Sequence, residues 1–396
     1  MTGPPPMPGN RGRETLRACG PAPVAWPAND PSPAPAPYAS MAKRPSRRMQ
    51  RTVERVANAA AAHNGDEVQV LGFTPRDFVL FGLPYKNPKT SLYLRRSGAL
   101  TFTITGGTRG VPFAQDRLLV IWLATVFKIC GSPESNAIAF DSLNEVAKSL
   151  GKASSGQQRR RIETGFLRLF DATFLAEDLR PNAIRRERYQ LMRRMRLWKE
   201  NDVRRPNQHT VCPNTLLYDQ VFANDIRQDA IPTDFRSVIA LSDNLGPLAF
   251  YQFQAYRSYT LARKNRPDMP VPILGPSGVL AQIGCNVKVE DTRKARQTAR
   301  LWHGIVKRLW PACPNELARD DTVLIVRGGY AIQHGRLPRA DEFGVRPLDE
   351  VALEQMREIP APLAIDRERE LPPERQFFAA PLARGPAEVT REGACS

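Results

Sequence analysis

The sequence predicts an α+β protein that is mainly helical, with tandem winged-helix domains (a helix-turn-helix plus a β-wing) between disordered termini. The first observation is a repeated order of elements: a helix, a short helix, a turn, a basic amphipathic helix and strand-like runs occur twice. The second is that both ends of the chain are rich in proline and charge and lack a sustained hydrophobic period.

These patterns divide the chain into four segments. Residues 1–65 are expected to be a disordered, Pro-rich and basic N-terminal segment, and residues 338–396 a mobile C-terminal tail. Between them we expect a first winged-helix domain with an N-terminal β-hairpin over residues 66–205, and a second winged-helix domain over residues 206–337.

The first copy follows a hairpin-like stretch, SLYLRRSGALTFTITGG, in which apolar residues alternate on both sides of Gly98. An apolar helix is predicted at about Asp116 to Cys130, and a short helix capped by Asp141 or Ser142 follows it. After the turn KASSG, a basic amphipathic helix is predicted from about Gln157 to Asp171. The strand-like pieces TFLAE and RYQLMRRMRLW, with the charged stretch DLRPNAIRRE between them, are predicted to form the wing.

The second copy starts with the helix LAFYQFQAYRSYTLARK, which Asp243 or Asn244 can cap, and SGVLAQIGCN takes the place of the short helix. The next helix, Thr292 to Trp310, has the clearest periodicity in the chain, and TVLIVRGGYAIQ then supplies two strand-like runs. The predicted buried face of this helix consists of Ala295, Ala299, Trp302, Val306 and Leu309.

The two basic helices are the candidates for contact with DNA. In a helix-turn-helix the second helix enters the major groove, where Arg pairs with guanine and Gln with adenine. The candidate residues are Gln157, Arg160, Arg161, Thr164 and Arg168 on the first helix, and Arg293, Lys294, Gln297, Arg300 and Lys307 on the second. The alternative is that such faces are merely solvated. DNA binding is favoured because two basic helices occur, each after a short helix and before strand-like runs, in a basic protein.

Further basic residues have two interpretations. The loop from Arg180 to Arg188 and the strand that contains Arg193, Arg194 and Arg196 are predicted to contact phosphates, although a charged surface hairpin would look the same. His303 is interpreted as a surface or phosphate contact rather than a catalytic base. Near the N-terminus, a basic arm that tracks the DNA backbone or a solubilising linker would account equally well for Lys43, Arg44, Arg47, Arg48 and Arg51.

One hypothesis concerns the start of the chain. Met41 is followed by Ala and Lys and resembles a natural translation start, so residues 1–40 would be an upstream extension.

The charge of the chain favours a polyanionic partner. Its 396 residues include 57 Lys plus Arg against 40 Asp plus Glu, a net charge of +17. Each Lys or Arg placed on a phosphate releases condensed counterions, so nucleic acid is the first candidate. A ribosome-associated protein would have the same composition. So would a protein that never contacts DNA but is encoded by a genome that favours Arg codons.

Other classes of protein are disfavoured. The six cysteines are dispersed without metal-ligand spacing, so neither a metal site nor a disulfide framework is expected. No apolar stretch is long enough to span a membrane and no secretory signal is visible, which favours a cytoplasmic location. The four histidines stand in no catalytic motif and there is no phosphate loop, so the chain is predicted not to be an enzyme and to have no catalytic residues.

Three blocks resemble the plasmid-encoded RepA family of replication initiators. They are LFGLPYKNPKTSLYLRRSGALTFTITGG, then GVPFAQDRLLVIWLATVF, then LNEVAKSLG with its Gly-rich turn. The resemblance runs approximately from Phe73 to Gln333, and the pattern G-V-P-x-x-x-D-R-L at Gly110 to Leu118 is its most specific part. Most of these positions are core and turn residues rather than a catalytic signature.

The resemblance implies a function that the residues alone do not. It implies tandem winged-helix domains that bind repeated double-stranded sites at a plasmid origin, help to open the duplex and recruit the host initiator and the replicative helicase. It also implies copy control through homodimers, and it implies no cofactor. The alternative is a sequence-specific transcription regulator with the same two domains. A nucleic-acid enzyme that needs a divalent metal is a third hypothesis.

Overall fold

The structure is a computed structural model, and it describes residues 47–63, 69–97, 99–131, 135–180, 183–197, 214–275, 277–285, 292–332 and 335–348. By contacts between Cα atoms, all of these described residues belong to one compact unit. Residues 1–40, with the hypothesis of an upstream extension, lie outside the described residues. The predicted division near residue 205 stays a prediction.

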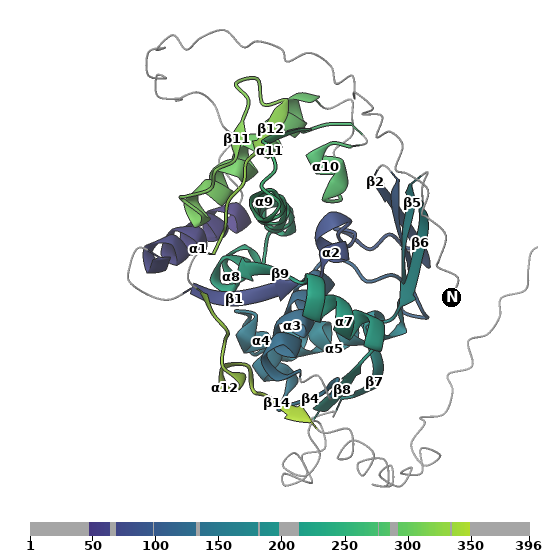
Figure 1. The fold of residues 1–396 in the computed structure, drawn as a ribbon. Coiled ribbons are helices and arrows are strands. Elements are labelled where there is room, and N and C mark those ends of the chain that lie inside the picture. Colours follow the sequence, from purple (N-terminus) through teal and green to yellow (C-terminus); the bar gives the residue numbers. More distant parts are fainter. Residues whose placement is uncertain are drawn as a thin grey trace, which may run out of the picture. The chain divides into compact units, whose positions relative to one another are not determined.

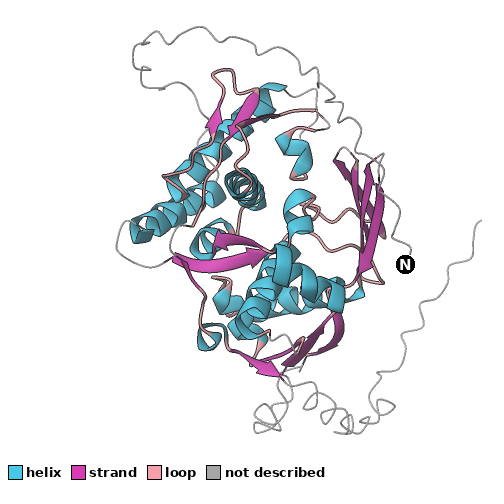
Figure 2. Cartoon of the chain, viewed as in Figure 1, coloured by secondary structure: helices cyan, strands magenta, loops and turns pink. Residues whose placement is uncertain are grey.

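Helices and strands are interspersed along the described residues (Figures 1 and 2). The helices are α1 (Arg47–His63), α2 (Arg76–Leu80), α3 (Asp116–Cys130), α4 (Leu143–Ser149), α5 (Gly156–Asp171), α7 (Gln220–Asp229), α8 (Phe235–Leu241), α9 (Leu245–Arg263), α10 (Val279–Gln282), α11 (Thr292–Leu309) and α12 (Ala340–Phe343). The strands are β1 (Gln69–Thr74), β2 (Leu92–Ser97), β3 (Leu100–Thr105), β4 (Ala137–Phe140), β5 (Thr173–Arg180), β6 (Ala183–Tyr189), β7 (Met192–Arg196), β8 (Asn214–Tyr218), β9 (Ile231–Asp234), β10 (Met269–Pro272), β11 (Glu316–Leu317), β12 (Val323–Val326), β13 (Gly335–Arg336) and β14 (Val345–Leu348).

The prediction of a mainly helical fold is wrong, because the described strands form four sheets. Their strand orders are β13-β1-β9, β10-β12-β11, β14-β4-β8-β7 and β2-β3-β5-β6. Several of these strands are short and largely buried: β4 buries all four residues of the sequence AIAF, and β8 and β9 bury all but one residue each. A run of this kind has no apolar-polar alternation, so its periodicity does not distinguish it from a helix or a buried loop.

The core of the first half is built around α3. Its residues from Asp116 to Phe127 are buried on every side, as expected for a helix that is apolar all round. β1, α5 and α7 pack against it. Trp122 is fully buried and lies edge-on to Phe140 and Phe166, which come from β4 and α5. This packing fixes α5, the first predicted DNA-contact helix, on the central helix.

The helix-turn-helix order of the first copy is formed by α4 and α5. The Ser142 side chain accepts a hydrogen bond from the backbone N–H of Glu145, and the Ser155 side chain accepts one from Gln158. Both helices therefore begin with an N-cap. The predicted wing differs from the structure, because the charged stretch is not a loop: most of it belongs to β5 and β6. These two strands join the predicted hairpin, β2 and β3, in one antiparallel sheet.

The second copy contains α9, β10, α10, α11, β11 and β12 in this order. β10 pairs with β12, and β12 pairs with β11, both antiparallel, so the three strands form their own small sheet. α11 packs along α9. The predicted cap of α9 is not formed as expected: its N-cap is Asn244, whose side chain makes no capping hydrogen bond.

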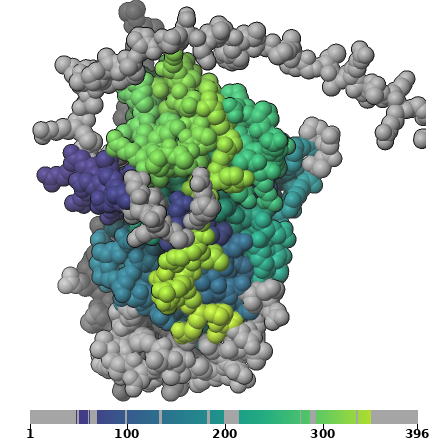
Figure 3. Space-filling model, turned by 60° about the vertical axis from the view of Figure 1, so that its left-hand side comes forward, coloured from purple at the N-terminus to yellow at the C-terminus, as the bar shows by residue number. Residues whose placement is uncertain are grey.

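Elements near both ends of the chain pack into the fold, where the sequence predicts disorder. α1 lies in the predicted disordered segment, yet it packs against α8 and α11 and buries Val56 completely. In the predicted mobile tail, α12 and β14 are formed and β14 pairs with β4. Figure 3 shows α1 against the light-green surface near residue 300, and the yellow-green segment of α12 and β14 over the blue first half. No described helix is long and apolar enough to cross a membrane.

Candidate nucleic-acid interface

The outer face of α5 is polar and open. Ile162, Phe166 and Leu169 are buried on the inner face, as the periodicity predicts. The opposite face exposes Gln157, Arg160, Arg161 and Thr164. The Thr164 hydroxyl donates to the Arg160 carbonyl at 2.7 Å, one turn back in the helix. Gln157 and the guanidinium groups of Arg160 and Arg161 have no hydrogen bond or ion pair with another described residue.

Arg168, at the end of the same face, is held inside the fold. Its Nε and Nη2 donate to the two carboxylate oxygens of Asp116, both at 2.8 Å, and its guanidinium lies 4.6 Å from the centre of the Phe113 ring. The Asp116 carboxylate also accepts from the Phe113 N–H at 2.9 Å. A two-pronged ion pair of this kind fixes α5 on α3, so the structure gives Arg168 a structural partner rather than an open surface.

A hollow of about 560 Å³ runs along the outer face of α5. One wall is the polar face of the helix. The other walls come from Tyr85, from residues 113–116 before α3 and from Leu245 at the start of α9. The sequence did not predict this hollow, since its walls come from segments that are far apart in the chain.

The outer face of α11 is more strongly basic. Ala295, Ala299, Val306 and Leu309 are buried, as predicted, while Trp302 is half-buried with its ring 6.0 Å from that of Phe250. The exposed residues are Thr292, Arg293, Lys294, Arg296, Gln297, Arg300, Leu301, Gly304 and Arg308. Five of them are basic or amide residues whose side chains have no hydrogen bond or ion pair with any described residue, namely Arg293, Lys294, Arg296, Gln297 and Arg308.

Two predicted contacts on α11 are already engaged within the protein. Arg300 is exposed but forms an ion pair with Asp321, in the turn before β12. Lys307 is half-buried, and its ammonium group donates to the Cys313 carbonyl at 2.5 Å. We therefore place the open part of this face at the first two turns of α11 and at Arg308.

The interpretation of His303 as a surface residue is wrong. Its side chain is buried on the side of α11 that faces the core. Burial, followed by the positive charge of Lys307, lowers the pKa of His303 to about 4. The imidazole is therefore neutral at physiological pH and adds no charge to the basic face of α11.

Arg193 and Arg194 lie on β7, which pairs with β8, and not on the β5–β6 pair. Arg193 is exposed and Arg194 is half-buried. The exposed arginines of β5 and β6 are Arg180, Arg185, Arg186 and Arg188, and Arg186 pairs with Glu177 at 2.7 Å. The residues predicted to contact phosphates therefore divide between two sheets: the arginines between positions 180 and 188 lie on β5 and β6, and Arg193 and Arg194 lie on β7.

A cluster around Asp243, which the sequence did not reveal, joins the two halves of the described unit. Asp243 lies between α8 and α9, and its carboxylate accepts from Lys152 and from Arg55, both at 2.5 Å. Lys152 belongs to the turn between α4 and α5, and Arg55 to α1. Burial opposes ionisation of Asp243, but hydrogen bonds and charge from Lys152 and Arg55 outweigh it and lower the pKa of this carboxyl.

The same turn packs directly on α8. Gly151 has a positive φ of 64°, which favours glycine, and a Cβ at this position would collide with Ile239. The first helix-turn-helix is therefore fixed relative to α8 by a close contact and by the ion pairs of Asp243. Asp243 was considered only as a helix cap in the sequence, because its partners are about 90 and 190 residues away.

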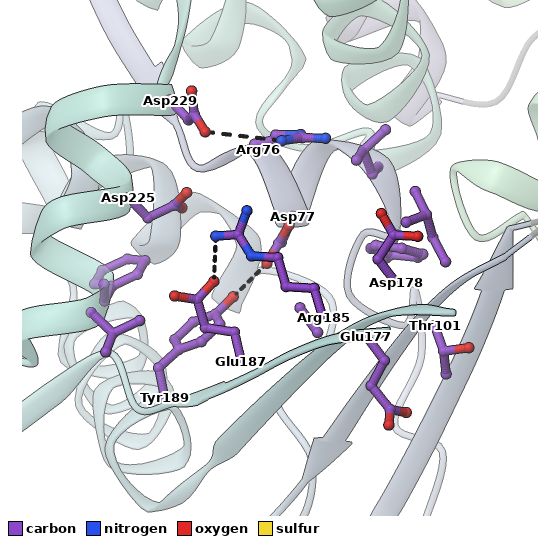
Figure 4. Close-up of a pocket in the computed structure, with 16 residues that line it drawn as sticks. Arg76, Asp77, Thr101, Glu177, Asp178, Arg185, Glu187, Tyr189, Asp225 and Asp229 are labelled. Atoms are coloured by element: carbon purple, nitrogen blue, oxygen red, sulfur yellow. Dashed lines mark hydrogen bonds and ion pairs between the residues drawn. The ribbon is translucent and has the colours of Figure 1, made fainter. Parts of the chain in front are cut away.

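A second hollow, of about 110 Å³, lies between α2, α7 and the inner face of the β2-β3-β5-β6 sheet and is mostly acidic (Figure 4). Tyr189 donates to Asp77 at 3.1 Å, and Arg76 lies 3.9 Å from Asp229. Burial, and then the charge of Asp77, raises the pKa of Asp225 to about 7. A surface of this sign would repel phosphates, so we do not assign it to the interface.

No group of three metal-ligating side chains occurs in the described part of the chain. Neither a protein-family profile nor a characterised protein sequence matches the chain. Among solved structures it is similar to domains 2 and 3 of RctB. A selenomethionine derivative of these domains is 12% identical, with a TM-score of 0.38, and the match covers 58% of this chain and 84% of that one. Another structure of RctB domains 2-3 is 12% identical, with a TM-score of 0.31 and 61% and 92% coverage. Matches with scores this low establish neither a shared fold nor a shared function.

Proposed function

We propose that the chain binds specific sites in double-stranded DNA through α5 and α11. The observation that carries the proposal is that both helices follow a short helix in the chain, α4 before α5 and α10 before α11, and that both present basic and amide side chains with no hydrogen bond or ion pair among the described residues. An unpaired Arg or Gln at the exposed start of a helix is the group that reads base edges in the major groove. The net charge of +17 supports the same partner.

The two helices would make different contacts with DNA. On α11, Arg293, Lys294 and Gln297 stand in the first two turns, where base contacts are usually made, and Arg308 at its other end is suited to a phosphate. On α5, Gln157, Arg160, Arg161 and Thr164 would contact a second segment of the duplex. The arginines that are already paired, Arg168 and Arg300, would position these helices rather than read bases.

We further propose that the site is a replication origin, where the chain acts as a plasmid replication initiator. This step rests on the resemblance of residues 73–333 to the RepA family. In this role the chain would bind repeated sites, help to open the duplex and recruit the host initiator and helicase, and it would form homodimers for copy control. The proposal contains no enzymatic step and no cofactor, and it places the protein with the DNA in the bacterial cytoplasm.

Footprinting of the purified full chain on the DNA that flanks its own gene tests this function. Regularly spaced protection over direct repeats would support an initiator. Protection of one promoter palindrome would instead indicate a transcription regulator and contradict the origin assignment. Cleavage that depends on a divalent metal would indicate an enzyme.

A matched pair of variants links the footprint to α11. Arg293→Ala should weaken the protection about tenfold or more, because it removes an unpaired candidate for base contact worth about 1–3 kcal/mol. Arg339→Ala removes the same charge from an exposed position just before α12, which packs on α3 and α4. This variant should leave the footprint intact. Equal behaviour of the two variants would contradict the assignment of α11.

A further inference from the structure

Gly304 lies in the interior of α11, on its exposed basic face. Its neighbours one turn away on the same face are Arg300, Leu301 and Arg308, all of them exposed. Glycine is the least favourable residue in a helix interior after proline, since the folded state must fix its backbone without any side-chain contact in return. A glycine at this position therefore requires a reason.

Neither backbone conformation nor packing within the chain supplies that reason. Gly304 is not among the glycines with positive φ, so any L-residue could adopt its conformation. Apart from its chain neighbours and the nearby backbone of α11, no atom of the described residues would lie within 4 Å of a Cβ added to Gly304.

Two other helix glycines show what a packing reason looks like. A Cβ on Gly165 of α5 would lie 2.6 Å from Leu119 of α3, and a Cβ on Gly246 of α9 would collide with Trp302. Each of these glycines allows two helices to approach closely. Gly304 offers the same close approach, but it faces solvent.

We propose that Gly304 marks the place where the sugar-phosphate backbone of duplex DNA lies against α11. The inference rests on the proposed DNA-binding function and assigns it a backbone-contact site. The open residues Gln297 and Arg293, about two and three turns from Gly304 towards the N-terminus, would lie in the groove, where they reach bases. At Gly304 the groove wall would then approach the helix, and a side chain there would push the phosphate away from Arg308.

A phosphate at this place would explain both the glycine at position 304 and the unpaired side chain of Arg308. Arg308 has no partner among the described residues and stands one turn after Gly304, where a guanidinium can hold a phosphate on the helix surface. The lack of a side chain between Arg300 and Arg308 lowers the stability of the helix but gives a phosphate direct access to the backbone of α11.

The test measures binding of the full chain to a random-sequence duplex of about 30 base pairs at low salt, since backbone contacts persist in non-specific complexes. Gly304→Ala should weaken binding about threefold and Gly304→Leu at least about tenfold, a loss that grows with the size of the side chain. Both variants should melt at or above the wild-type temperature, because alanine and leucine favour the helix. Gln228→Leu serves as the control: it places a leucine on an exposed position of α7, where the affinity should stay within about twofold.

The outcomes separate the inference from the function on which it rests. If the wild type binds the duplex and folded Gly304→Leu binds equally well, the backbone contact at Gly304 is wrong and DNA binding stands. An equal loss in Gln228→Leu would also overturn the inference, because the effect would not belong to α11. If the wild type fails to bind the duplex at low salt, the proposed function and the inference both fall.

Discussion

At the scale of single residues, α11 separates side chains that are available from side chains that are engaged. Arg293 and Gln297 are unpaired on its outer face, whereas Arg300 binds Asp321 and Lys307 binds a carbonyl. Sequence periodicity placed all four on one polar side, because it cannot show whether an ion pair already uses a charge. The structure therefore narrows the list of residues whose replacement should affect recognition.

The double variant Arg293→Ala/Gln297→Ala should lose discrimination between a specific site and random DNA. Each lost base contact should cost about 1–3 kcal/mol of specific binding. Because both side chains are exposed, the melting temperature should stay unchanged. Competition binding and thermal melting measure the two effects, and unchanged specificity in a folded variant would contradict the role of these residues.

Asp225 offers a residue-scale prediction about pH. Its pKa is raised to about 7, so folding holds its proton more tightly than the unfolded chain does. The free energy of unfolding should therefore fall as the pH rises from about 4 towards 7. Asp225→Asn removes this cost and should be more stable than the wild type at pH 8, by an amount on the order of 2 kcal/mol, with the two equal near pH 3.

Chemical denaturation of both proteins across this pH range tests that account. A variant that is less stable than the wild type at pH 8 would show that the carboxylate makes a favourable contact there.

At the scale of elements, the ion pairs of Asp243 hold three of them together: α1, the turn before α5, and the α8–α9 joint. Its pKa is lowered, so its stabilisation is present above the pKa of the unfolded chain, about 4, and is lost as the pH falls through the lower folded value. Asp243→Asn should reduce stability at pH 7 by about 1 kcal/mol, a modest value because the carboxylate is partly exposed. The difference should vanish at strongly acid pH.

Denaturant titrations at pH 7 and pH 2 would measure this difference. An equal loss at both values would mean that the effect comes from packing rather than from charge.

Helix α1 gives a second prediction at this scale, because it is folded where the sequence suggested disorder. It buries Val56 and Thr52 and packs on α8 and α11. A chain that begins at residue 66 should therefore melt at a lower temperature than a chain that begins at residue 46. Equal melting temperatures of the two chains would show that α1 adds nothing to the fold.

The elements divide into those that a sequence reveals and those that it does not. α5 and α11 were located because each repeats its apolar residues over four turns or more. β4, β8 and β9 were missed since they are short and pair with distant segments; β4 pairs with both β8 and β14. α1 was missed because the prolines before residue 46 masked its periodicity. The Asp243 cluster and the hollow beside α5 likewise depend on packing between distant segments.

At the scale of the whole molecule, the described unit carries basic faces on α5 and α11 and an acidic hollow at α2 and α7. An uneven distribution of this kind orients a protein on a polyanion. The logarithm of its affinity for duplex DNA should fall linearly with the logarithm of salt concentration, and Arg308→Ala should reduce the slope by about one. A slope that does not change in this variant would show that Arg308 contacts no phosphate.

The measurement that tests the central claim most directly is selection of binding sites from a random duplex pool by the full wild-type chain, repeated with Arg293→Ala/Gln297→Ala and with Arg160→Ala/Arg161→Ala. The account predicts an enriched motif with two parts, one lost in each variant. Failure of the wild type to enrich any motif, or enrichment that neither variant alters, would contradict the claim that α5 and α11 read DNA.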